Sequence, residues 1–224
     1  MNHLHDEILT FCHTHADHDK ALGMKAYMKG QFEYFGISAP LRKAYVKTFK
    51  KKHTLTLDEH LICLIYKLWS DPHRECQYIA MDILSLFSNS LNATHIPLLE
   101  ALVTNKSWWD TVDLIACNMV GKVFLHDLTC RDQYIYTWIE SQNMWLNRTA
   151  IIFQLKHKEA TDWDIIRDAI ITHEQSKEFF IRKAQGWALR QYSRIAPIKV
   201  IDFVESHPAL SGLTKREATR LIKK

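Results

Sequence analysis

The segment FFIRKAQGWALRQY, residues 179–192, contains a triplet that recurs along the chain and decides the expected fold. In every copy an arginine is followed two positions later by a small residue. The copies are Arg42-Lys43-Ala44, Arg74-Glu75-Cys76, Arg148-Thr149-Ala150, Arg182-Lys183-Ala184 and Arg216-Glu217-Ala218. Their arginines lie 32, 74, 34 and 34 residues apart, and 74 is two steps of 37. This period is the length of a helix pair in a HEAT or tetratricopeptide repeat.

The segments between the triplets have the apolar spacing of amphipathic helices. The expected helices cover residues 57–69, 131–140, 162–171 and 196–205. Each precedes a helix that carries a triplet, and polar residues or proline separate the two. No linker or low-complexity tract divides the chain. We therefore expect one domain, residues 1–224, folded as an all-α superhelix (solenoid) of about six HEAT-like helix pairs.

The composition agrees with a helical protein. Of the 224 residues 47% are hydrophobic and 24% are charged, while only 6 Gly and 5 Pro provide turns for short strands. Five widely spaced cysteines without a CxxC pair indicate reduced thiols and a cytoplasmic protein. No signal peptide or membrane span is expected. A net charge of +4 and a pI of about 8.7 favour polyanionic partners mildly.

The stretch SWWDTVDLIA, residues 107–116, occupies the place of the missing triplet. Asp113 stands where the other copies have a small residue, so its carboxylate must have a strong partner or face a solvated cleft. Trp109 and Asp113 are one helical turn apart, beside the core stripe. Packing of a tryptophan over an aspartate at a helix start is an equally good explanation of this row. The expected core stripe is Trp108, Val112, Ile115, Ala116, Met119, Val120, Val123 and Phe124.

SWWDTVD resembles the signature of the AlkD family of bacterial DNA glycosylases, helical-repeat enzymes that excise alkylated purines. Three other segments resemble the same family: YMKGQFEYFGISAPLRK (27–43), WLNRTAIIFQLKHKEATDWD (145–164) and FFIRKAQGWALRQY (179–192). The similarity extends over residues 25–205. It implies a concave DNA-binding face, with Asp113 as the catalytic carboxylate.

The resemblance also implies that Trp109 and Trp187 flank the deoxyribose of the lesion and that Arg148 holds a backbone phosphate. Without it, Trp187 fits a core stripe of its helix better than a site. Lys43 departs from the family pattern, which has a second arginine after Arg42, and lysine does not make a bidentate phosphate contact. The residues expected to bind DNA are Arg148, Tyr27, Arg190, Arg74, Arg182 and Lys156.

Equivalent positions of successive repeats line one surface, so the triplet arginines should form a stripe that follows a phosphate backbone. An arginine that bonds carbonyl groups or acids of its own repeat is the alternative, which stays open for Arg42 and Arg216.

Alkylation at position 3 or 7 gives a purine a positive charge, so the base is already a good leaving group. The remaining requirement is an anion beside the oxocarbenium-like sugar. Asp113 would supply this anion and orient the attacking water. Two indole faces would add cation–π attraction of roughly 0.5 to 2 kcal/mol each. The resemblance implies that the base is not flipped into a pocket.

The sequence thus predicts DNA alkylation repair by base excision, performed by a monomeric, monofunctional glycosylase that hydrolyses N-glycosyl bonds of 3- and 7-alkylpurines in duplex DNA. No cofactor is expected. No metal is expected either, although five histidines crowd the N-terminus: His3, His5, His13, His15 and His18. One alternative is a catalytically silent solenoid that binds damaged or branched DNA. A protein-binding scaffold of the HEAT type is another alternative. It would lack the salt-dependent binding of duplex DNA that phosphate contacts produce.

Overall fold

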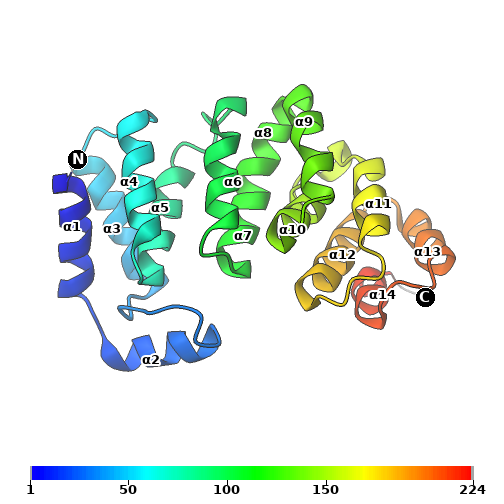
Figure 1. The fold of residues 1–224 in the computed structure, drawn as a ribbon, viewed down its shortest axis with the longest axis horizontal. Helices are drawn as coiled ribbons and strands as arrows, with labels where there is room; N and C mark the ends of the chain where they lie inside the picture. The colour runs from blue at the N-terminus through cyan, green and yellow to red at the C-terminus, as the bar shows by residue number, and fades with distance from the viewer. Residues whose placement is uncertain (1, 223–224) are drawn as a thin grey trace. The chain divides into compact units, whose positions relative to one another are not determined.

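The computed structural model describes residues 2–222. Within this range the chain is helical, with one isolated β-bridge between Glu33 and His73 (Figure 1). The chain forms two compact units, residues 1–90 and 91–224. The all-α prediction is confirmed, while a single continuous repeat domain stays a prediction. No helix in the described range is long and apolar enough to cross a membrane.

The first unit ends in a helix pair, which three further helices precede. It contains α1 (Asn2–Thr14), α2 (His18–Tyr27), α3 (Ala39–Lys52), α4 (Glu59–Ser70) and α5 (Arg74–Ser85). The helix pair expected here is α4 with α5, and these two pack on each other. Helix α3 also packs on α5, and α1 packs on α4. Helix α2 buries none of its side chains.

The second unit is a series of helix pairs that follow one another in chain order (Figure 1). Its helices are α6 (Ile96–Thr104), α7 (Trp109–Ile115), α8 (Gly121–His126), α9 (Leu128–Ile139), α10 (Met144–Ile152), α11 (Trp163–Thr172), α12 (Phe179–Tyr192), α13 (Pro197–Ser206) and α14 (Gly212–Thr219). Within this unit α10 packs on α7, α9 and α12, and α12 packs on α14.

The four helices expected before the triplets are present as α4, α9, α11 and α13. Three of them start at an aspartate whose side chain accepts a backbone N–H of the first turn: Asp58, Asp127 and Asp162. The helix-pair period is therefore confirmed for these segments, and local capping sets their starting points.

The small residues of four triplets are buried, as the repeat requires: Cys76, Ala150, Ala184 and Ala218. The expectation is wrong for Ala44, which is exposed. Helix α3 buries Arg42, Val46 and Phe49. A residue two positions after Arg42 lies about 200° round the helix and therefore faces solvent.

The predicted core stripe is buried from Val112 to Phe124, whereas its first member, Trp108, is half-buried and precedes α7, and the helix along the stripe is not regular. A π-helical turn, Ala116–Val120 (η2), separates α7 from α8. Gly121 follows it, and a Cβ atom there would lie 2.3 Å from the Phe153 carbonyl oxygen. The missing side chain lets the chain after α10 approach closely. The regular helical spacing on which this stripe was predicted is therefore interrupted at this point, next to the helix that carries Asp113.

Candidate functional site

Three second-unit helices present the predicted site residues. Helix α7 begins at Trp109, after Trp108 in an extended conformation, and places Asp113 one turn later. Helix α10 begins after Asn143, whose side chain accepts the Trp145 N–H, and carries Arg148. Helix α12 carries a row spaced by three or four residues along one face: Phe180, Lys183, Trp187 and Arg190.

Asp113 and Arg148 form a bidentate ion pair between α7 and α10. Arg148 Nε donates to Asp113 Oδ1 at 2.7 Å, and Arg148 Nη2 donates to Oδ2 at 2.8 Å. Arg148 Nη1 donates to the carbonyl oxygen of Phe180 in α12. The Arg148 side chain is 5% exposed and that of Asp113 is 17% exposed. Of the two alternatives that the sequence left for Asp113, the structure thus has the strong partner, and that partner is Arg148.

Burial and the ion pair act on Asp113 in opposite directions. Removal from water raises the pKa of Asp113 above its ordinary value, while the hydrogen bonds and charge of Arg148 act to lower it. The negative charge of Asp110 adds to the increase. One turn later, burial raises the pKa of Cys117 to about 12, so this thiol is protonated at neutral pH. In the row formed by Trp109, Asp113 and Cys117, Asp113 is therefore the group that can carry a negative charge.

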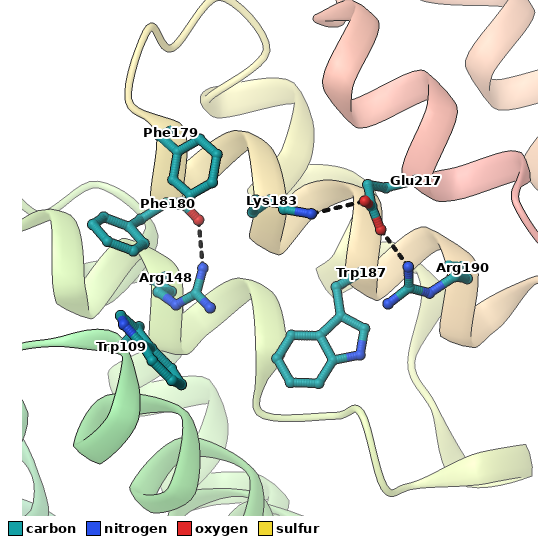
Figure 2. Close-up of a pocket in the computed structure, with 8 residues that line it drawn as sticks. All are labelled: Trp109, Arg148, Phe179, Phe180, Lys183, Trp187, Arg190 and Glu217. Atoms are coloured by element: carbon teal, nitrogen blue, oxygen red, sulfur yellow. Dashed lines mark hydrogen bonds and ion pairs between the residues drawn. The ribbon is translucent and has the colours of Figure 1, made fainter. Parts of the chain in front are cut away.

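A pocket of about 370 Å³ opens beside this ion pair. Its lining residues are Trp109, Arg148, Phe179, Phe180, Lys183, Trp187, Arg190 and Glu217 (Figure 2). The structure thus brings Trp109 and Trp187 to one pocket, although 78 positions separate them in the sequence. Arg148 connects Asp113 to the pocket. Two electron-rich rings near a carboxylate can stabilise a cation held between them.

Trp187 does not lie in the buried core of its helix, where helical spacing alone would place it. Ala184 and Ala188 are buried, but Trp187 is half-buried and lines the pocket. The aromatic packing behind the site is formed instead by Trp108, whose ring centroid lies 5.1 Å from that of Phe180 and 5.9 Å from that of Trp145.

Sequence reasoning missed the cluster at the other side of the pocket. Glu217 accepts Lys183 Nζ at 2.7 Å and also accepts Arg190 Nη1. Lys183 and Glu217 are the middle residues of two successive triplets, 34 positions apart. Opposite charges at equivalent repeat positions were the signal that could have identified this contact.

The other predicted DNA-binding residues are scattered. Arg74 is 0% exposed, with its guanidinium carbon 3.8 Å from the Phe32 ring centroid, so it does not form part of an exposed arginine stripe. Arg182 Nε donates to the Ser176 carbonyl oxygen at 2.7 Å. Lys156 is exposed and donates to Asn118 Oδ1. Tyr27 is 70% exposed at the end of α2, in the first unit.

Some triplet arginines bind carboxylates of the protein and are not exposed along a stripe. In the first unit, Arg42 Nε donates to Asp82 Oδ2 at 2.7 Å and its guanidinium lies 4.7 Å from the Tyr78 ring centroid. Arg42 is therefore held in an internal ion pair, but its partner lies on α5, the helix of the next triplet, and not in its own repeat as the alternative supposed. Arg216 is exposed, as a member of a stripe would be. The expected phosphate contacts of Arg148 and Arg190 stay predictions, because both side chains already bind carboxylates.

Comparisons with known proteins agree with the resemblance seen in SWWDTVD. A solved structure from Enterococcus faecalis, described as a predicted DNA alkylation repair enzyme, is 35% identical with a TM-score of 0.85, over 92% of this chain and 96% of that one. The crystal structure of AlkD2 from Streptococcus mutans shares the fold, with a TM-score of 0.62 at 14% identity over 84% of this chain and 92% of that one. No curated protein matches. The model of the DNA alkylation repair enzyme family matches residues 11–222, and the chain belongs to this family.

Proposed function

We propose that this protein is a DNA glycosylase that hydrolyses the N-glycosidic bond of cationic 3- and 7-alkylpurines in duplex DNA. One observation carries the proposal: Trp109 and Trp187 line the same pocket, and the Asp113 carboxylate is joined to it through Arg148. Such a pocket suits a substrate whose positive charge grows on the sugar during reaction. Its size and open aromatic walls support reaction without a deep base-recognition site.

Each site residue has a proposed task. The Asp113 carboxylate stabilises the oxocarbenium-like sugar and orients the attacking water. Trp109 and Trp187 flank the deoxyribose and attract its charge through their ring faces. Arg148 is a positioning residue, because its two bonds fix the direction of the carboxylate. The reaction needs no strong general acid and no metal, because alkylation already makes the base a good leaving group.

Binding of duplex DNA is supported by lysines in the first unit. Lys43, Lys47, Lys50 and Lys51 lie on one face of α3 and line a groove of about 530 Å³ next to α5. Lysines at this spacing suit a run of phosphates. We propose further phosphate contacts from Tyr27, Arg182, Lys156 and Arg190. The proposed active form is a cytoplasmic monomer.

The first test is release of the free base from a duplex that contains a single 7-methylguanine. We expect single-turnover release by the purified protein well above the spontaneous rate, and duplex binding whose log K falls linearly with log salt. Repetition with 3-methyladenine measures the substrate range. The same duplex without a lesion is the control. Salt-sensitive binding without release from either lesion would contradict the glycosylase proposal.

One observation favours the alternative of a silent DNA-binding protein. Both oxygens of Asp113 already accept hydrogen bonds from Arg148, and Asp113 does not itself line the pocket. In this role the carboxylate stabilises the packing of α7 on α10 through an ion pair and takes no part in catalysis. Under this alternative, base release is absent and the salt dependence of binding remains.

The pH dependence of release follows from the raised pKa of Asp113. The ionised carboxylate is the active form, so activity is lost as the pH falls through that pKa. Because burial raises the pKa, we expect this acidic loss at a higher pH than an ordinary aspartate, with a pKa of about 3.9, would give. Single-turnover rates between about pH 4 and 8, corrected for spontaneous depurination, measure it. An acidic limb at or below the ordinary aspartate value would contradict this assignment.

A further inference from the structure

The carboxylate of Glu217 lies in the pocket between two cations. It is held by Lys183 and Arg190, which lie about two turns apart on α12, on either side of Trp187 (Figure 2). The Glu217 side chain is 16% exposed. Hydrogen bonding from Lys183, and then the charges of both cations, keep the pKa of Glu217 below its ordinary value. Glu217 is therefore ionised at neutral pH.

The packing of α14 on α12 is shaped for this contact. Gly186 precedes Trp187, and a Cβ atom at Gly186 would lie 2.5 Å from Glu217 Cβ and 3.0 Å from the Thr214 carbonyl oxygen. Any side chain at position 186 would push α14 away. Thr214, three residues before Glu217, donates from Oγ1 to the Arg182 carbonyl oxygen at 3.2 Å. The close approach of the two helices therefore delivers a carboxylate to the pocket wall.

The charges of the pocket oppose the reaction proposed for it. Asp113 compensates Arg148, which leaves Lys183 and Arg190 as two positive charges next to Trp187. Positive charge attracts phosphates, but it raises the energy of a cationic sugar and weakens the attraction of a cation to the indole face. The negative charge of Glu217 compensates one of these two positive charges.

We propose that Glu217 is a charge-balancing residue of the active site, which weakens DNA binding and, in exchange, favours formation of the cationic sugar. This inference rests on the proposed glycosylase function. It makes Glu217 a positioning and charge-tuning residue, acting through Lys183 and Arg190, and not a group that touches the reacting atoms.

A purely structural role for Glu217 makes a different prediction. If the ion pairs only fasten α14 to α12, their loss loosens the pocket, and binding and catalysis both decline. A charge-balancing role gives effects of opposite sign on the two quantities. The two roles can therefore be separated by measuring the Kd for duplex DNA and the single-turnover rate of base release on the same variants.

The test variant is Glu217→Gln, which keeps the shape and removes the charge. We expect tighter binding to the lesion duplex and slower release of 7-methylguanine, each by about fivefold, as one added charge several ångströms away in a partly solvated pocket would produce. The control is Glu205→Gln, at an exposed position of α13. It makes the same change in net charge outside the pocket, so its release rate should equal that of the wild type.

A second variant restores the charge of the pocket. In Glu217→Gln combined with Lys183→Gln, one positive and one negative charge are removed, and release should return close to the wild-type rate. Lys183→Gln alone leaves Glu217 paired with Arg190, so it should fold. It should bind DNA more weakly and release the bound lesion faster.

Unchanged or faster release by Glu217→Gln, or weaker binding together with slower release, would overturn the proposal while leaving the glycosylase function intact. Slow release in Glu217→Gln that Lys183→Gln does not restore would also overturn it. If the wild type binds but does not release either base, the glycosylase proposal itself fails, and the role of Glu217 fails with it.

Discussion

Replacing Asp113 with asparagine will abolish measurable base release and leave duplex binding in place. Asparagine has the size of aspartate, and its amide oxygen can still accept a bond from Arg148. What disappears is the anion next to the developing positive charge. Loss of an electrostatic group that acts on the transition state costs about 100- to 1,000-fold in rate. Binding should be equal or tighter, because the Arg148 charge is no longer compensated.

The measurement is single-turnover release of 7-methylguanine by the wild type and by Asp113→Asn at equal occupancy of the duplex. Asp202→Asn is the matched control, because it removes an exposed carboxylate of α13 that does not line the pocket. It should release the base at the wild-type rate. Thermal unfolding of each variant checks that the fold is kept. If Asp113→Asn is folded, binds DNA and retains most of the wild-type rate, Asp113 takes no part in the chemistry.

Replacing Arg148 with alanine will produce the largest loss of stability among the site variants. The Asp113 carboxylate would then be largely buried without its two charge-assisted hydrogen bonds, and the Phe180 carbonyl oxygen would lose the bond from Arg148. Breaking a buried ion pair on one side costs about 3 to 5 kcal/mol. At this chain length, that corresponds to a fall in Tm of about 6 to 20 °C.

Tryptophan fluorescence during urea unfolding is a suitable measurement, because every tryptophan except Trp69 lies in the second unit. Arg216→Ala is the control. Arg216 is exposed, so its removal should change the free energy of unfolding by less than about 0.5 kcal/mol.

The double variant Arg148→Met with Asp113→Leu removes both charges and should recover most of the lost stability. Equal stability of Arg148→Ala and Arg216→Ala would show that the ion pair does not hold α7 and α10 together. Recovery in the double variant without base release would separate the structural contribution of the pair from its catalytic one.

The sequence alone determined the helices and their order. Apolar spacing, with polar residues or proline between segments, predicted α4, α9, α11 and α13, because these signals act within a few residues of one another. The row of Trp109 and Asp113 also followed from helical spacing. The family was recognised from the short motif SWWDTVD and the segments that accompany it. The sequence did not predict the π-helical turn after α7, nor the close approach of Gly121 to the chain after α10, which is a tertiary contact.

Only the tertiary structure decided which charged groups meet. Arg148 and Arg74 occupy equivalent triplet positions, yet one binds Asp113 and the other is buried against Phe32. Trp187, which fits a core stripe by helical spacing alone, lines the pocket, and α14 supplies Glu217. Spacing along one helix fixes the face on which a side chain lies. Its partner depends on how helices more than 30 residues apart pack together, and local periodicity contains no information on that packing.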